Sequence, residues 1–137
     1  MQFHRGRLLD HVHLRVADLA ASKRFYQAVL SALGHAEVLQ EGPGFFYADE
    51  LFVNQADDYI TRIHLALQAA DQASVQAFHR AALAAGGRDN GAPGERPYHP
   101  GYYAAFVLDP DGNNIEAVFH GPASRSAASV VISPAAS

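Results

Sequence analysis

The first half of the sequence returns in the second half after a shift of 53 residues, as in His11 and His64. The match runs without a gap over a whole strand-and-helix unit and includes the pairs Leu14 and Leu67, Ala17 and Ala70, Asp18 and Asp71, Phe25 and Phe78, Ala28 and Ala81, Leu30 and Leu83, and Gly34 and Gly87. This register indicates an internal duplication. A duplication constrains the fold strongly, because both copies must then form the same structural unit.

Each copy begins with an alternating run and continues with a helical pattern. Residues 8–16 and 61–69 alternate with period two, which predicts a strand in each copy. Asp18 and Asp71 are suited to cap helices over 19–33 and up to Ala85, and glycines follow both helices. Further strands are expected at 36–40, 44–48, 51–54, 102–108 and 114–119, and the Gly/Pro-rich stretch 91–101 is interpreted as a loop.

These elements predict an α+β fold. Two βαβββ modules, at about 8–55 and 61–119, would form a curved mixed sheet with the helices outside and a concave metal or ligand cleft. We expect a single domain over 1–120 and a Ser/Ala-rich tail over 121–137. The apolar island Val130–Ile132 in this tail is either disordered or part of an arm that lends a strand to a neighbour.

Composition excludes several classes of function. A net charge of −4 and a pI of about 6.0 argue against nucleic acid or an anionic membrane as a partner. No apolar run reaches membrane-spanning length, and Met1 to Asp10 lacks the apolar region of a signal peptide. The absence of cysteine excludes disulfides and thiolate chemistry, which is consistent with a cytoplasmic protein.

Three side chains are predicted to meet on the open face of the sheet. His11 and His64 occupy equivalent repeat positions, opposite the apolar faces of their strands, and Glu116 lies on the polar face of 114–119. Two imidazoles and one carboxylate from separate strands form the facial set that holds a divalent metal with positions left open. The remaining histidines considered, His13, His35, His79 and His120, are interpreted as ordinary surface or core groups.

Several stretches resemble a known superfamily. DHVHLRVADLAASKRFYQAVL resembles the opening of the vicinal oxygen chelate superfamily, the glyoxalase/bleomycin resistance/dioxygenase group, and HLAL and DPDGNNIEAV resemble its later motifs. GGRDNGAPGERPYHPGYYAAF is similar to a subgroup called glyoxalase-like. The resemblance covers residues 8–119 and implies one divalent metal ion (Zn, Ni, Mn or Fe), with His11, His64 and Glu116 as ligands.

The resemblance also raises the question of a fourth ligand. Glyoxalase I has a further Glu on the last strand of the first module, which serves in proton transfer. The corresponding position here falls at or near Val53, and a shift would place Glu50 there. Glu50 is otherwise a solvated turn residue, so a three-ligand site is the favoured interpretation. Glu50 and Tyr102 are the candidates for proton transfer, and Glu116 is the essential ligand for catalysis.

Candidate substrate contacts come from two places. Arg15 shares a face with His11, and the resemblance places it where glyoxalase I has an arginine that contacts glutathione. The 91–101 stretch and the residues after it supply Arg96, Tyr98, His99 and Tyr103, which would close over the cleft as a lid.

We therefore expect a metal-dependent lyase, isomerase or thiol transferase acting on a small oxygenated molecule. One alternative is a metal-free protein that sequesters a drug, as bleomycin-resistance proteins do, and another is an extradiol-type dioxygenase. The chain is also expected to form a homodimer, because each module leaves uncovered sheet edges.

Overall fold

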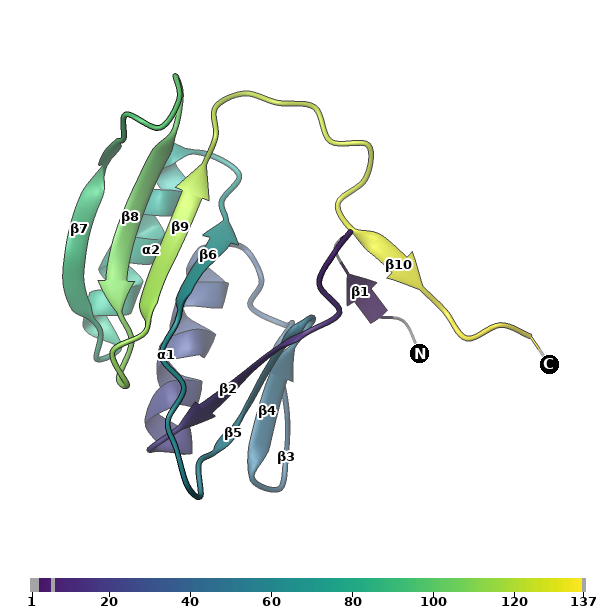
Figure 1. Cartoon of the computed structure of the whole chain (residues 1–137). Helices are drawn as coiled ribbons and strands as arrows, with labels where there is room; N and C mark the ends of the chain where they lie inside the picture. Colours follow the sequence, from purple (N-terminus) through teal and green to yellow (C-terminus); the bar gives the residue numbers. More distant parts are fainter. Residues whose placement is uncertain (1–2, 6, 137) are drawn as a thin grey trace.

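The computed structural model describes residues 3–5 and 7–136. Along the chain the elements are β1 (Phe3–Arg5), β2 (Val12–Val16), α1 (Leu19–Ala32), β3 (Gln40–Gly42), β4 (Phe45–Ala48), β5 (Leu51–Gln55), β6 (His64–Gln68), α2 (Gln72–Ala84), β7 (Arg88–Glu95), β8 (Tyr103–Leu108), β9 (Asn114–Phe119) and β10 (Val130–Ile132) (Figure 1). Predictions that start at Met1 or run to Ser137 lie partly outside these residues.

Two four-stranded mixed sheets form the body of the molecule, one from each repeat. Their strand orders are β2-β5-β4-β3 and β6-β9-β8-β7. In each sheet the first strand of the repeat lies at an edge and pairs parallel with the last strand, while the other pairs are antiparallel. The predicted pair of βαβββ modules in an α+β fold is confirmed.

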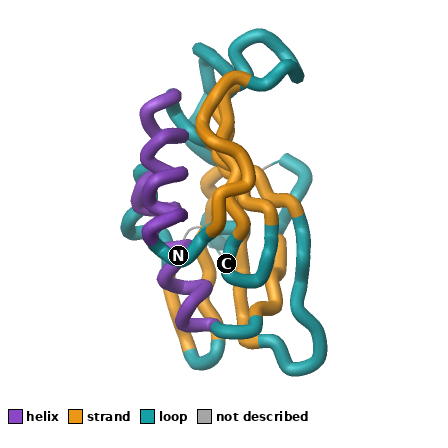
Figure 2. Tube along the Cα trace, turned by 90° about the vertical axis from the view of Figure 1, so that its left-hand side faces the viewer, coloured by secondary structure: helices purple, strands orange, loops and turns teal. Residues whose placement is uncertain are grey.

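Both helices lie on one side of the strands, and their predicted boundaries agree with the structure (Figure 2). Asp18 accepts a hydrogen bond from the Ala21 backbone N–H at 3.1 Å, and Asp71 accepts one from Ser74 at 2.7 Å. Each cap satisfies an N–H group that the first helical turn leaves without a partner. Gly34 has a φ of 91°, the left-handed conformation that favours glycine after a helix.

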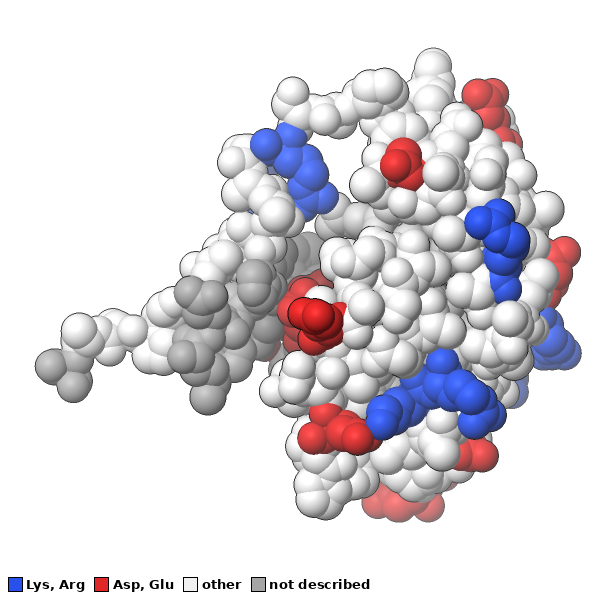
Figure 3. Space-filling view, turned by 180° about the vertical axis from the view of Figure 1, so that it is seen from behind, with Lys and Arg blue, Asp and Glu red and all other residues white. Residues whose placement is uncertain are grey.

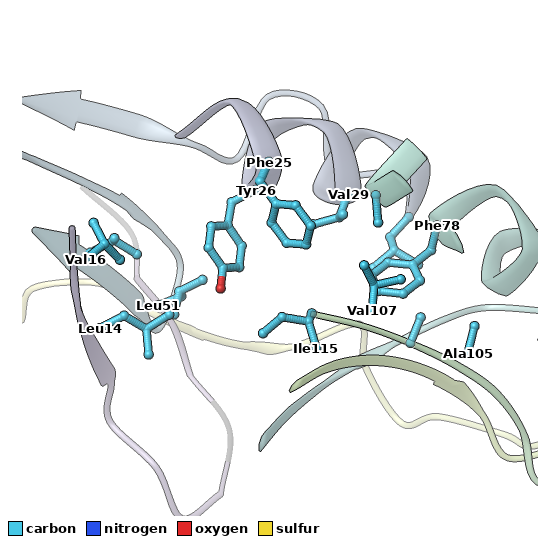
Figure 4. Packing of buried hydrophobic residues seen from close by; sticks show 14 of the residues in the cluster. Leu14, Val16, Phe25, Tyr26, Val29, Leu51, Phe78, Ala105, Val107 and Ile115 are labelled. Carbon is cyan, nitrogen blue, oxygen red and sulfur yellow. The ribbon is translucent and has the colours of Figure 1, made fainter. Parts of the chain in front are cut away.

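One apolar core joins the two repeats beneath the helices (Figure 4). Phe25 and Val29 of α1, Phe78 of α2, and Ile115 of β9 are all fully buried in it. The helices α1 and α2 also contact each other. The helix-facing side of every central strand is therefore covered, and the opposite face carries both polar residues and aromatic rings such as Phe52.

The turn before β9 is fixed by a buried carboxylate. Asp109 is 2% exposed and accepts hydrogen bonds from the backbone N–H groups of Asp111 and Asn113. It also accepts one from the Tyr26 hydroxyl of α1 at 2.5 Å. Because each donor offsets the desolvation of the carboxylate, the network can hold the hairpin against the other repeat's helix.

The prediction of a loop over 91–101 is wrong for its first half. Residues 88–95 form β7, which pairs antiparallel with β8 and has register shifts between Asp89 and Gly91 and between Gly91 and Gly94. Pro93 lies within the second shift, at the edge of the sheet, where no ladder hydrogen bond requires its missing N–H. Glycine and proline thus indicate an irregular edge strand here.

Strand ends differ from the prediction in other places. The strands expected over 8–16 and 61–69 are shorter, at Val12–Val16 and His64–Gln68, and the strand expected at 36–40 begins only at Gln40. Val130–Ile132 pairs with β1 of the same chain in a two-stranded sheet. Figure 1 shows this ribbon beside the body, after a long connection from β9. None of the helices described is long and apolar enough to cross a membrane.

Candidate functional site

His64 and Glu116 lie together on the open face of the second sheet. The imidazole Nε2 of His64 is 2.8 Å from Oε1 of Glu116. The Glu116 side chain is only 3% exposed, whereas the His64 side chain is 53% exposed. Strand alternation produces this arrangement, because Ile115 and Ala117 face the core and leave Glu116 on the other side. A buried carboxylate beside an accessible imidazole is a ready pair of metal donors.

Tyr102 holds the other carboxylate oxygen. Its hydroxyl donates a short hydrogen bond to Oε2 of Glu116. Burial, followed by this hydrogen bond and the charge of Glu116, raises the pKa of Tyr102 to about 12. Tyr102 therefore remains a protonated donor near neutral pH. This orients Glu116 and makes Tyr102 unsuited to act as a base there.

Phe106 and Arg96 complete this face beside the pair. Phe106 lies opposite Glu116 in the β8–β9 register, and its ring centroid is 5.9 Å from that of His64. The Arg96 guanidinium lies 5.4 Å from the Phe106 ring centroid and donates to the Ala92 carbonyl at 2.7 Å. A side chain at Gly91 would come within 3.3 Å of this guanidinium, so glycine leaves room for it.

Phe106 is not among the residues predicted from the sequence. The alternation along 102–108 contains the signal, since Ala105 and Val107 face the core and Phe106 must face the other way.

His11 lies elsewhere in the single chain. It directly precedes β2, its Nδ1 is 2.7 Å from Oδ1 of Asp10, and its side chain is 61% exposed. In the described part of the chain, no three His, Asp or Glu side chains are grouped to hold a metal ion. The two histidines of the repeat are therefore not brought to one point within one chain. The three-ligand site of His11, His64 and Glu116 stays a prediction.

The pairing register defines the position of a fourth ligand. His13 pairs with Phe52 in the first sheet just as Ala66 pairs with Glu116 in the second, and His13 and Ala66 are repeat equivalents. The counterpart of Glu116 is thus Phe52. Val53 is fully buried in the core. Glu50 is an exposed residue before β5, and its carbonyl accepts a hydrogen bond from the Val12 N–H at 2.7 Å.

The remaining predicted substrate contacts lie in different parts of the molecule. Arg15 forms ion pairs with Asp57 and Asp58, and its guanidinium lies 4.5 Å from the Tyr59 ring centroid, so its charge is already balanced. Tyr98 is 68% exposed and packs edge-on against Tyr102, as His99 does.

Tyr103 lies on the opposite side of the sheet from Glu116. It packs against the core, and its hydroxyl accepts a hydrogen bond from Gln76 of α2 at 3.0 Å. The side-chain alternation of β8 causes this placement, which separates Tyr103 from the candidate site.

Comparison with known families identifies the class of protein. The sequence model of the Glyoxalase/Bleomycin resistance protein/Dioxygenase superfamily matches residues 8–117. The chain belongs to this superfamily, which confirms the resemblance found in the sequence. No curated protein matches the sequence.

Solved structures share the fold over most of the chain. A glyoxalase/bleomycin resistance protein from Albidiferax ferrireducens T118 is 28% identical, with a TM-score of 0.68 over 82% of this chain and 98% of that one. A glyoxalase-related enzyme from Fulvimarina pelagi is 20% identical, with a TM-score of 0.66 over 83% and 88%. A lactoylglutathione lyase from Agrobacterium tumefaciens is 22% identical, with a TM-score of 0.58 over 83% and 94%.

Proposed function

We propose that this chain is a metal-dependent enzyme of the glyoxalase-like type, acting on a small oxygenated molecule by a lyase, isomerase or thiol-transfer reaction. The observation that carries the proposal is the His64–Glu116 pair, with 2.8 Å between Nε2 and Oε1 on the open face of the sheet. Burying a carboxylate is costly unless it is hydrogen-bonded, paired with a charge or bound to a cation, and Glu116 is buried beside an accessible imidazole.

The donor set fits a divalent ion. One imidazole nitrogen and one carboxylate oxygen suit Zn, Ni, Mn or Fe, and Tyr102 fixes Glu116 as an outer partner of a ligand commonly does. A divalent ion bound there supplies Lewis-acid polarisation of substrate oxygens. Phe106 would form an apolar wall beside the substrate, and Arg96 would attract an anionic group on it.

A second copy of the chain would supply His11. The strands β2 and β6 are edge strands of their sheets; the β2 edge is hydrogen-bonded to Thr61 at Arg15, and His11 lies at the other end of the strand. Leu8 and Leu9, just before His11, are 91% and 56% exposed, an apolar surface that a partner would cover. A twofold homodimer would apply the same contact twice and complete two equivalent sites.

Mixing two defective variants tests both the metal site and its subunit composition. His11→Ala and Glu116→Gln each remove one ligand, so each homodimer should lose tightly bound metal. Coexpression of the two should restore about one quarter of the wild-type sites, since half the dimers are mixed and each mixed dimer holds one intact site of two. Metal is counted by elemental analysis after passage over a chelating resin.

The outcome of the mixture is decisive. If both variants lose metal and the mixture recovers none, His11 is not supplied by a second chain. If Glu116→Gln keeps the full metal content, the metal site itself is wrong. Mixing His11→Ala with His64→Ala provides an independent repeat, because His64 lies on the same side of the proposed interface as Glu116.

One observation supports a metal-free alternative. Both oxygens of Glu116 already have partners within the chain, from His64 and Tyr102. Glu116 therefore needs no metal ion to satisfy its hydrogen-bonding capacity. This is the arrangement expected of a protein that binds a ligand without a metal. Wild-type protein that elutes without metal and regains none on dialysis against Zn²⁺, Ni²⁺, Mn²⁺ or Fe²⁺ would favour this alternative.

A further inference from the structure

Two histidines meet at the end of the second sheet, outside the His64–Glu116 pair. His99 lies in the connection between β7 and β8, and His120 directly follows β9. Nε2 of His99 is 2.9 Å from Nδ1 of His120, and the two rings stack with 19° between their planes. Both residues are exposed. The sequence interpretation of His120 as an ordinary histidine did not anticipate this pairing.

The backbone holds the two histidines in place. Gly101 and Gly121 have φ values of 89° and 97°, and a side chain at Gly101 would come within 3.1 Å of the His120 carbonyl oxygen. The two segments can therefore pack with no side chain between them. The Tyr102 ring packs edge-on against both imidazoles, with centroids 5.4 Å from His99 and 5.1 Å from His120. The pair is thus supported from two sides.

The hydrogen bonds orient His99 in the way that metal-ligating histidines are oriented. Its Nδ1 lies 2.8 Å from the Pro100 carbonyl oxygen, which can only accept. The proton of neutral His99 is thus at Nδ1, and the lone pair is at Nε2, the atom that faces His120. A ligating imidazole almost always donates its other N–H to a carbonyl or carboxylate in this manner.

The spacing fits adjacent positions around one ion. Two nitrogens, each about 2.05 Å from an ion, are about 2.9 Å apart at a right angle and about 3.3 Å apart at a tetrahedral angle. The observed 2.9 Å equals the right-angle value and is also the length of the hydrogen bond between the rings, so each ring must turn to direct its nitrogen lone pair at one ion. We propose that His99 and His120 form a second metal site, which binds Ni²⁺ or Cu²⁺ with water in the remaining positions.

Binding at this site would replace a proton. Because the Pro100 carbonyl keeps the His99 proton at Nδ1, His120 donates its own Nδ1–H to His99 in the metal-free pair. An ion that takes both nitrogens requires this proton to leave Nδ1 of His120, either to its Nε2 or to solvent. The bound ion would connect the β7–β8 segment to the end of β9, which lie at the same end of the sheet (Figure 1).

Nickel titration of untagged protein tests the proposal in a background that lacks the other site. His64→Ala removes a donor of the His64–Glu116 pair and does not touch His99 or His120. We expect His64→Ala protein to bind one Ni²⁺ per chain by calorimetry. Adding His99→Ala or His120→Ala should weaken this binding by at least about tenfold. His35→Ala is the matched control, because His35 is also exposed.

Any one of three results would contradict the proposal of a metal site at His99 and His120. His64→Ala protein could bind no Ni²⁺, the His99 and His120 substitutions could leave affinity unchanged, or His35→Ala could weaken it equally. Melting curves without metal verify that the variants fold. A paramagnetic Cu²⁺ spectrum that shows two nitrogen ligands in His64→Ala protein, and loses one in each double variant, would identify the ligands directly.

Discussion

The parallel strand pair of the first repeat, β2 with β5, can be compared residue by residue with that of the second, β6 with β9. On the core side Leu14 pairs with Val53, and its repeat equivalent Leu67 pairs with Ala117, so both positions remain apolar. On the open side the equivalent pairs are His13 with Phe52 and Ala66 with Glu116. Packing has kept the two cores alike, while the open faces have become different.

This difference has a chemical consequence. The second repeat contains a carboxylate held by two partners, whereas the first presents an aromatic ring at the same place and an exposed His11 before its strand. In the proposed site neither repeat alone would supply all three ligands, so the two open faces would be complementary rather than equivalent. Figure 3 shows the molecule from the helix side, where charged side chains of both signs are interspersed.

The largest effect is expected from Glu116→Gln. Loss of a charged ligand should reduce metal affinity by more than the roughly 10–100-fold that loss of an outer partner costs, and metal-dependent activity should disappear. Glu50→Gln is the matched control, since Glu50 precedes the equivalent strand of the first repeat. This substitution should barely change metal affinity or activity. Elemental analysis and activity assays measure both. Equal losses in the two variants would show that the first repeat also supplies a carboxylate.

The second prediction concerns glyoxalase I turnover. A base must lie within about 2.6–3.2 Å of the proton it removes, or one water away. Phe52 occupies the counterpart of Glu116 and cannot act as a base. We expect weak or no turnover of the methylglyoxal–glutathione adduct by metal-loaded wild-type protein, monitored by absorbance of the thioester product. Robust turnover that collapses in Glu50→Gln would restore a four-ligand site.

Tyr102→Phe should have the next largest effect. It removes the donor to Oε2 of Glu116 and retains the ring that packs against His99 and His120. Metal affinity should fall by roughly tenfold, at the low end for an outer-shell partner. Tyr98→Phe is the control, as Tyr98 is largely exposed. Competition with a chromogenic chelator measures both affinities, and identical values would exclude a positioning role for the Tyr102 hydroxyl.

Periodicity and repetition in the sequence were sufficient to predict the modules, both helices and the face of Glu116. These features depend on interactions between residues that are close in the sequence. Examples are side-chain alternation along a strand and the helix caps formed by Asp18 and Asp71. The sequence prediction groups Tyr103 with the substrate contacts of the preceding loop, although the predicted strand 102–108 already puts Tyr102 and Tyr103 on opposite faces. One residue of shift in a strand reverses the face.

Other features depend on contacts between distant segments. The identity of Phe52 as the counterpart of Glu116 requires the strand register, which composition does not contain. The distance between His11 and His64 depends on how the two sheets are arranged around α1 and α2. A pseudo-twofold relation between repeats does not by itself determine whether equivalent residues meet in one chain or across two.

A fourth prediction compares equivalent helix positions in stability. Tyr26 of α1 donates to buried Asp109, and its repeat counterpart in α2, His79, pairs with exposed Asp89 at 3.0 Å. Tyr26→Phe should lower the free energy of unfolding by about 1–3 kcal/mol, because a buried carboxylate oxygen loses a donor. Asp109 keeps its hydrogen bonds from Asn113, so the loss of stability should lie near the lower end of this range. Urea denaturation measures the change.

The smallest effect is expected from His79→Ala, and its pH dependence distinguishes it from Tyr26→Phe. A hydrogen bond from His79, followed by one from the Gly91 N–H, holds the pKa of Asp89 below its usual value. A depressed carboxylate pKa stabilises the fold above the unfolded pKa, and this stabilisation is lost as pH falls through the folded value. The difference in melting temperature between wild type and His79→Ala should therefore be present at pH 6 and shrink as the pH falls through the lowered pKa of Asp89. A difference that stays constant across this range would mean that His79 acts through its packing, and the second repeat would then resemble the first in relying on buried contacts.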